Sequence, residues 1–375
     1  MPSGHAIWIT RMKLSGIRVL DLSAFLPGPH ASMMMADHGA EVIMVEPDNG
    51  LGEPTRAMGE RYDDGTSVWF ANIARGKKSY RVNLKDEAQH AGFMALAKTA
   101  DVVIEAFRPG VVKRLGVDYA AIRAVKPDIV YCSISAFGQD GRYRNKPAHD
   151  LVVQAMAGTA DLTRSMDGAP ALTPMPSADM TASLFALSGI LMALYRREQT
   201  GQGDYLDIAM YDSLLSWVPN VTGAVFAEDR QPERTKMRSF GGNAFVNIYR
   251  TRCGGHIVLG GSEPKFVANF LNAVDRPDLL PLTKRPVGQQ QALITDLQAL
   301  FLSRTQSQWE RLLSEVDCCW STLRTLHTAL SEDGAPVVTD EQGHKHIANP
   351  IRFREEPAQI SFDLPEFGEH TKDLT

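Results

Sequence analysis

Short apolar runs rich in β-branched residues alternate with amphipathic segments through the first 135 residues, and this alternation restricts the fold more than any other feature. Strands followed in turn by helices indicate a parallel sheet, because parallel neighbours need a crossover connection. Right-handed crossovers then place helices on both faces of the sheet. The expected strands are Arg18–Leu22, Glu41–Glu46, Asp101–Ala106 and Ile129–Ser135, and the expected helices are Ala31–His38, Leu84–Thr99 and Tyr119–Val125.

The second half of the chain changes character. Apolar residues recur at helical spacing through Met180–Arg197, which predicts a long helix, and Asp204–Ala209 predicts one more strand. The polar segment Glu228–Arg238 is typical of a linker, and short strands and helices follow it. We therefore expect an α/β fold with a large domain over 1–225, completed by 335–375 returning to it, and a smaller α+β domain over 240–334.

The bulk composition excludes several classes of function. A net charge of −5 leaves no basic stripe of the kind that binds nucleic acid. The four cysteines have neither metal-site spacing nor the look of a disulfide framework, so we expect reduced thiols and no bound metal. No apolar run reaches the length of a membrane span and no signal segment begins the chain, so we expect a cytoplasmic protein without membrane contact.

Two ionisable residues are candidates for catalysis. Asp179 directly precedes the long predicted helix, which places its carboxylate at the positive end of the helix dipole. It is either an N-cap that accepts backbone N–H groups or a nucleophilic or acid/base carboxylate, and a capping oxygen is the weaker nucleophile. His149 is followed by Asp150. It is either a local hydrogen-bonding residue or an acid/base group whose ring that carboxylate orients.

Two further segments each have a binding and a structural interpretation. Gly260-Gly261 separates a predicted strand from a helix, and its glycines suit either a plain turn or close approach of the backbone to a ligand. The long excursion Pro47–Arg81 carries the basic cluster Arg75–Lys78, which we expect either to hold phosphates or to form a solvated face. The pair Gly50-x-Gly52 lacks the third glycine of a dinucleotide loop, so dinucleotide binding is not expected.

Segments in order across nearly the whole chain resemble the class III CoA-transferase family, also called the carnitine dehydratase/bile-acid-inducible family. Each segment is weak singly, and together they are specific. They are Gly16–Asp21, Pro27-Gly28-Pro29, Gly39–Ile43, Val45-Glu46-Pro47, Arg75–Ser79, Ala100–Glu105, Phe107–Gly110, Arg114-Leu115-Gly116, Phe137–Gly141, Ala178-Asp179 and Gly368–Thr371.

The resemblance implies a Rossmann-like large domain with a parallel sheet, a small α+β domain and an interlocked homodimer. It implies acyl-CoA and a free carboxylic acid as partners, with coenzyme A arriving as the thioester substrate and no permanently bound cofactor. It makes Asp179 a nucleophile that forms a covalent aspartyl intermediate, and it places the turn Gly260-Gly261 over that intermediate. The CoA contacts of the family correspond to Val82, Lys85, Ala106, Phe107, Arg108 and Arg114.

The same family contains the α-methylacyl-CoA racemases, in which residues matching His149 and Asp179 form an acid/base pair supported by one matching Glu263. His149-Asp150 and Glu263 favour a racemase. The segment Leu151–Ala155 and the excursion Pro47–Arg81 favour a transferase, which is the main hypothesis. A catalytically silent CoA-binding protein is the third hypothesis.

One departure from the family affects the expected CoA site. The position after Glu46 is basic in some relatives and is Pro47 here. Either Arg56 or the cluster Arg75–Lys78 then supplies the charge, or that contact is missing. The acyl group and the acceptor acid are left open by the sequence.

Overall fold

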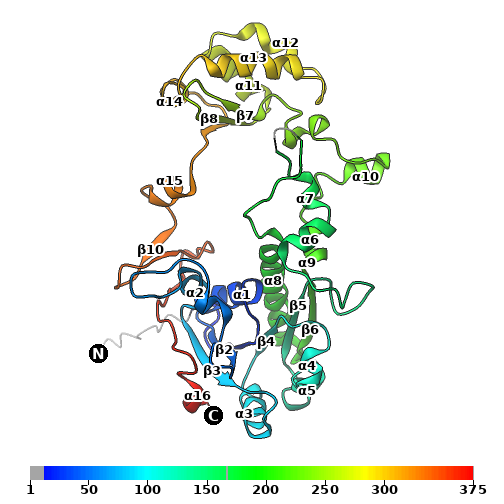
Figure 1. The fold of residues 1–375 in the computed structure, drawn as a ribbon, viewed down its shortest axis with the longest axis vertical. Helices are drawn as coiled ribbons and strands as arrows, with labels where there is room; N and C mark the ends of the chain where they lie inside the picture. Colours follow the sequence, from blue (N-terminus) through cyan, green and yellow to red (C-terminus); the bar gives the residue numbers. More distant parts are fainter. Residues whose placement is uncertain (1–11, 166–167, 375) are drawn as a thin grey trace, which may run out of the picture. The chain divides into compact units, whose positions relative to one another are not determined.

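The structure is a computed structural model that describes residues 12–165 and 168–374 (Figure 1). The chain forms two compact units. The large unit extends to Trp217 and resumes at Pro336, and the small unit is Val218–Ala335.

The large unit is built on a six-stranded sheet within the described residues, and every pair of neighbouring strands in it is parallel. In sheet order the strands are β3 (Lys77–Val82), β2 (Glu41–Pro47), β1 (Arg18–Asp21), β4 (Val102–Glu105), β5 (Val130–Ser135) and β6 (Asp204–Ala209). This confirms the predicted α/β fold with a parallel sheet. The order reverses between β1 and β4, and in open α/β sheets ligands bind outside the carboxyl ends of the strands at such a switch point.

Helices cover both faces of this sheet, because successive strand residues point to opposite sides. Val19 and Val42 belong to one buried cluster, whereas Leu20 and Ile43 belong to the other. The first face is covered by α1 (Pro27–Ala36), α6 (Asp150–Met156), α8 (Ser177–Thr200) and α9 (Met210–Leu215), and the second by α3 (Glu87–Ala97), α4 (Val111–Arg114) and α5 (Tyr119–Val125).

Two helix starts differ from the prediction. Helix α1 begins at Pro27 rather than Ala31, because prolines are tolerated in a first turn whose N–H groups have no helical acceptor. Helix α8 begins at Ser177, so Asp179 lies inside its first turn rather than ahead of it.

Helix α8 also corrects the expectation about apolar length. It has 24 residues, a mean hydropathy of 1.5 in its most apolar stretch, and is long and apolar enough to cross a membrane. Half of that stretch is buried in the large unit, where α8 packs against α1, α9, β5 and β6. A core helix has the same properties.

The excursion after β2 contains a strand that the sequence did not predict. It comprises the 3₁₀ turn η1 (Pro54–Ala57), helix α2 (Val68–Ala74) and then β3, which is an edge strand of the sheet. The C-terminal part of the chain returns to this edge through β10 (Val337–Thr339), β11 (Lys345–Ile347) and α16 (Thr371–Leu374). The N–H of His370 donates to the carbonyl of Ser79, which covers part of the open edge.

The small unit has an antiparallel sheet in the order β7-β8-β9. Its core includes Trp309, Phe270, Phe301 and Tyr249. Its elements are α10 (Gly223–Glu228), η2 (Arg234–Lys236), η3 (Arg238–Phe240), β7 (Val246–Arg250), β8 (His256–Gly260), α11 (Pro264–Ala273), η4 (Pro277–Leu279), α12 (Leu280–Thr283), α13 (Gln291–Leu302), α14 (Gln306–Leu313), β9 (Trp320–Thr322) and α15 (Leu326–Ser331).

Candidate active site

The N-terminus of α8 lies at the carboxyl edge of the large sheet. Helix α8 crosses over between the parallel strands β5 and β6, so it runs back against the strand direction. Near its C-terminal end, Arg197 pairs with Asp101, which immediately precedes β4. Its first turn, with Asp179, is therefore at the opposite edge, where ligands bind in this class of fold.

Asp150, and not Asp179, caps this helix. One carboxylate oxygen of Asp150 accepts the N–H of Ala178 at 2.7 Å and that of Asp179 at 3.2 Å. The side chain of Asp179 accepts no hydrogen bond from any residue that the structure describes. The interpretation of Asp179 as an N-cap is therefore wrong, and its carboxylate remains free.

The environment of Asp179 favours the protonated form. Burial, and then the charge of Asp150, raise the pKa of Asp179 from 3.8 to about 7. Helix N–H groups would oppose this shift, but two of them are already bonded to Asp150. Near neutral pH both protonation states are populated, so the ionised form that a nucleophile requires and the two forms that an acid/base group uses are both present.

The position of Asp150 is fixed by a hydrogen bond from Gln154. The side-chain amide of Gln154, one turn later in α6, donates to Asp150 and to the carbonyl of Met175. Gln154 is buried, so this link ties α6 to the segment that enters α8. Gln154 therefore fixes the position of the Asp150 carboxylate, and this carboxylate in turn fixes the first turn of α8.

His149 precedes α6, and its ring contacts Phe25 rather than Asp150. The ring is exposed, makes no hydrogen bond with a described residue, and packs edge-on against Phe25 with centroids 5.8 Å apart. Asp150 does not orient it, because the oxygens of Asp150 serve α8 and Gln154. Phe25 follows β1, so His149 lies beside the switch point of the sheet.

A histidine that the sequence analysis missed lies on the neighbouring helix. His30 Nδ1 is 2.9 Å from the Oγ of Ser183, which is one helical turn after Asp179. Burial, and then the charges of Lys77 and Arg75, lower the pKa of His30 to about 4, so the ring is neutral at pH 7. The sequence signal was its place in the first turn after Pro27-Gly28-Pro29.

The predicted CoA contacts follow the carboxyl ends of β3 and β4. Val82 ends β3 and is buried, and Lys85 beyond it is exposed. Ala106 and Phe107 follow β4 and are half-buried, and the N–H of Phe107 donates to Glu105 at 2.8 Å. Arg108 and Arg114 are exposed just beyond.

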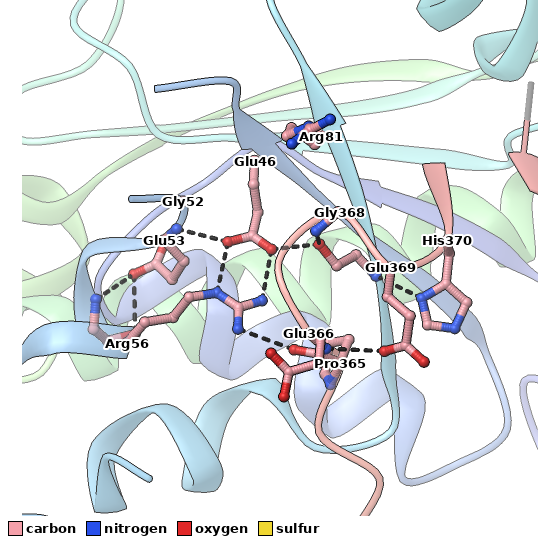
Figure 2. Close-up of polar contacts among 12 residues, drawn as sticks. Glu46, Gly52, Glu53, Arg56, Arg81, Pro365, Glu366, Gly368, Glu369 and His370 are labelled. Carbon is pink, nitrogen blue, oxygen red and sulfur yellow. Dashed lines mark hydrogen bonds and ion pairs between the residues drawn. The ribbon is translucent and has the colours of Figure 1, made fainter. Parts of the chain in front are cut away.

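The two groups proposed to replace a cation at Pro47 are otherwise engaged. Arg56 donates to both carboxylate oxygens of Glu46, at 2.8 and 2.7 Å (Figure 2). In the cluster Arg75–Lys78, Arg75 and Lys77 are buried and pair with Asp37 and Asp21. Lys78 pairs with Glu41. The cluster is neither a phosphate site nor a solvated face, because carboxylates already bind its three cations. These carboxylates come from distant parts of the chain.

A basic loop that the sequence analysis did not single out lies between β5 and His149. Arg142, Arg144 and Lys146 are exposed and form no ion pair with any described residue. Tyr143 anchors the loop against Phe137 with centroids 5.6 Å apart, and Arg142 lies over its ring. The signal in the sequence was three cations within five residues next to a candidate histidine.

The remaining predicted site residues belong to the small unit. Gly260 ends β8 and donates its N–H to the carbonyl of Cys319. A Cβ atom on Gly261 would lie 2.7 Å from the side chain of Cys319, so this position has no room for a larger residue. Glu263 precedes α11 and lies 4.0 Å from Arg238.

Metal ligation finds no support in the part of the chain that the structure describes. No three His, Cys, Asp or Glu side chains gather there as a metal site would require. The described residues at the site include a free carboxylate, an exposed imidazole and loops whose cations form no ion pair with a described residue.

Comparison with known proteins shows the family of the chain. The sequence model of CoA-transferase family III matches residues 14–371. A succinyl-CoA–D-citramalate CoA-transferase of Chloroflexus aurantiacus is 30% identical, over 96% of this chain and 92% of its own. A succinyl-CoA:glutarate CoA-transferase of Mus musculus is 29% identical, over 100% and 90%.

Solved structures extend the likeness to three dimensions. A CAIB/BAIF family protein from Brucella suis matches with a TM-score of 0.84 and 25% identity, over 97% of this chain and 98% of that one. Rv3272 from M. tuberculosis matches with a TM-score of 0.85 and 27% identity, over 97% and 99%. The resemblance seen in the sequence is confirmed, and the chain belongs to CoA-transferase family III.

Proposed function

We propose that this chain moves coenzyme A between two small dicarboxylic acids, with Asp179 as a covalent nucleophile. The transfer of CoA is the activity of the family, and relatives are named for succinyl-CoA with citramalate, glutarate or mesaconate. The observation that carries the proposal is the carboxylate of Asp179, which is partly desolvated and accepts no hydrogen bond from a described residue.

The proposed reaction starts with ionised Asp179. One of its oxygens attacks the thioester carbonyl of the donor, and CoA thiolate leaves to give a mixed anhydride. The thiolate then attacks the aspartyl carbonyl, releasing the donor acid and leaving an aspartyl-CoA thioester. The acceptor carboxylate attacks that thioester, which expels CoA thiolate and forms a second mixed anhydride between Asp179 and the acceptor. The thiolate finally attacks the acceptor carbonyl of this anhydride, which gives the acceptor CoA thioester and frees the carboxylate of Asp179.

The phosphates of CoA need unpaired cations at the carboxyl edge of the sheet. Arg56 and the cluster Arg75–Lys78 are engaged in ion pairs. We assign the role to Lys85, Arg108 and Arg114 together with the basic loop Arg142–Lys146. Phe107 is half-buried after β4 and suits stacking on adenine.

An interlocked homodimer is part of the proposal. One side of α8 exposes apolar side chains at helical spacing, with Leu184 39%, Leu191 38%, Met192 70% and Tyr195 71% exposed. A partner subunit would bury such a stripe. Met192→Glu should weaken the dimer in light scattering after gel filtration, and an unchanged mass would contradict this use of the stripe.

Trapping the intermediate tests the nucleophile. Enzyme, succinyl-CoA and hydroxylamine should give a hydroxamate on the peptide containing Asp179, read by mass spectrometry. Asp179→Asn should abolish both the label and CoA transfer to a panel of dicarboxylates. Glu198→Gln, an exposed carboxylate at the other end of α8, should leave both unchanged.

The same samples separate the alternatives. Deuterium entering the α-carbon of an acyl-CoA without any acceptor acid would indicate the racemase, for which a carboxyl group with a pKa near 7 is also suited. Binding of CoA with neither reaction, unchanged in Asp179→Asn, would indicate a silent binding protein.

A further inference from the structure

Phe25 adopts a backbone conformation that its side chain disfavours. Its φ of +66° lies in the left-handed region, where a bulky residue is a true outlier. Phe25 lies between β1 and α1, at the switch point of the sheet, and its ring meets that of His149. Strain of this kind persists only where surrounding structure enforces it, and it concentrates at functional sites.

A buried carboxylate accepts the backbone N–H of this strained residue. The N–H of Phe25 donates to Glu53 Oε1 at 3.0 Å. The same oxygen accepts from the backbone and the hydroxyl of Thr55, which define its position. Glu53 is 4% exposed, and no part of the proposed reaction uses it.

Glu53 is in turn fixed by Glu46. The N–H of Glu53 donates to Glu46 at 2.7 Å, and Arg56 binds both oxygens of Glu46 (Figure 2). The hydroxyl of Ser79 on β3 donates to Glu46 as well. The carboxylate at the end of β2 therefore joins the loop 52–56 to the sheet.

The C-terminal segment completes this network. Arg56 donates to the carbonyl of Pro365 at 2.9 Å, and the N–H of Gly368 donates to the hydroxyl of Ser79 at 2.7 Å (Figure 2). A Cβ on Gly52 would lie 2.8 Å from the ring of Phe367, so the segment packs directly on the loop. Residues more than 300 positions apart in sequence thus hold the loop that carries Glu53.

We propose that Glu53 is a positioning residue that holds Phe25 in its left-handed conformation, so that the phenyl ring forms a wall of the acyl site beside His149. The loop 52–56, clamped by Glu46, Arg56 and the segment 365–371, is the base from which Glu53 acts. This inference rests on the proposed function, because the acyl site is placed by Asp179 and His149.

Phe25→Gly removes the backbone strain and the ring together, so Tm reports on structure and kcat on function. Phe25→Gly introduces a residue that adopts this conformation freely, so the Tm of the variant should stay within a few degrees of that of the wild type. Its kcat for CoA transfer should fall roughly 10- to 100-fold with little change in the KM for acyl-CoA, because the reacting groups are less well positioned. Leu51→Ala, another exposed apolar residue in this region, is the control.

A double-mutant cycle tests the link to Glu53. Glu53→Ala should lower kcat by a similar factor, Glu53→Gln should restore most of it through its remaining oxygen, and the exposed Glu60→Ala should be silent. Phe25→Gly combined with Glu53→Ala should lose no more than either alone, because both remove the same wall.

The outcomes are distinguishable. A wild-type enzyme that transfers no CoA would refute the proposed function. A working wild type in which Phe25→Gly keeps full kcat, or in which the two losses multiply, would refute the role of Glu53 instead. A fall in Tm without loss of kcat per folded enzyme would show that Glu53 is purely structural.

Discussion

Two carboxylates near the same sheet differ in their hydrogen bonding. Glu46, at the end of β2, is buried and accepts hydrogen bonds from Arg56, Ser79 and the backbone of Glu53. Asp179, in the first turn of α8, accepts none from the described residues, and another carboxylate takes the helix N–H groups beside it.

The difference separates a structural acid from a candidate catalytic one. A buried charge that is paired and fully hydrogen-bonded holds its neighbours in place. A carboxylate that is desolvated without donors has a raised pKa and remains available to react. In a dinucleotide-binding Rossmann domain an acidic residue at the end of β2 would contact the ribose. Here that residue is Glu46, and Arg56 binds both of its carboxylate oxygens.

The largest expected effect comes from unpairing Glu46. Arg56→Met should lower the free energy of unfolding by about 3–5 kcal/mol, because it leaves a buried carboxylate without its cation. Urea denaturation measures this change. Arg123→Met, which removes an exposed arginine with no ion pair among the described residues, should cost under about 0.5 kcal/mol. Equal losses in the two variants would remove the distinction drawn for Glu46.

A glycine pair probes how tightly the Glu46 network is packed. Gly50 and Gly52 have φ values of +78° and +67°, so an alanine at either is strained by about 1–2 kcal/mol. At Gly52 the added Cβ also meets Glu46 and Phe367, whereas nothing lies within 4 Å at Gly50. Gly52→Ala should therefore cost roughly 1–3 kcal/mol more than Gly50→Ala in the same denaturation experiment.

Neutralising the other carboxylate should stabilise the protein. The pKa of Asp179 is raised from 3.8 to about 7, so the folded state favours the proton. Its stabilising contribution is complete below pH 4 and is lost as the pH rises through 7. At pH 8 the free energy of unfolding of Asp179→Asn should therefore exceed that of the wild type by about 1–2 kcal/mol, after allowance for partial exposure, and its Tm should be higher. Near pH 4 the two Tm values should be equal.

The smallest effect concerns the neighbour of Asp179. Below pH 7, kcat/KM should rise about tenfold per pH unit, because the free enzyme must ionise Asp179 before attack. Asp150→Asn keeps an oxygen for the cap and removes a charge, so the midpoint should move to lower pH. Burial is the larger cause and remains, so the shift should be a fraction of a unit. An unmoved profile would exclude Asp150 as a tuning charge.

Strands β1, β2, β4 and β5 were predictable because each contains an apolar run in a sheet covered on both faces. Strand β6, at the other edge of the sheet, was also predicted, although it carries Asp204 and Asp207. Strand β3 was missed because it begins Lys77-Lys78, which is typical of a solvated segment. Its cations find their partners on β1 and β2, about 40 to 60 positions earlier.

The site shows the same division. Asp179 was chosen as a candidate from its place before an apolar helix, and its catalytic role stays a prediction, whereas the match to CoA-transferase family III supports the activity. The capping role was misassigned because Asp150 is 28 positions away, and local spacing cannot reveal a cap that arrives from another helix. The roles proposed for the basic loop and for Glu53 likewise depend on which cations and carboxylates are already engaged in ion pairs and hydrogen bonds.

The order of apolar and polar residues determined by itself that this chain forms a parallel sheet with crossover helices. A helix buried on one face and a strand buried on both faces each require a characteristic local spacing of apolar residues. Family membership also followed from the sequence. Only the tertiary structure decided which charged side chains are engaged in the fold and which remain free. Glu46 with Arg56, Asp150 with the α8 N-terminus and Glu53 with Phe25 are pairings between residues 10 to 28 positions apart, and no local pattern encodes them.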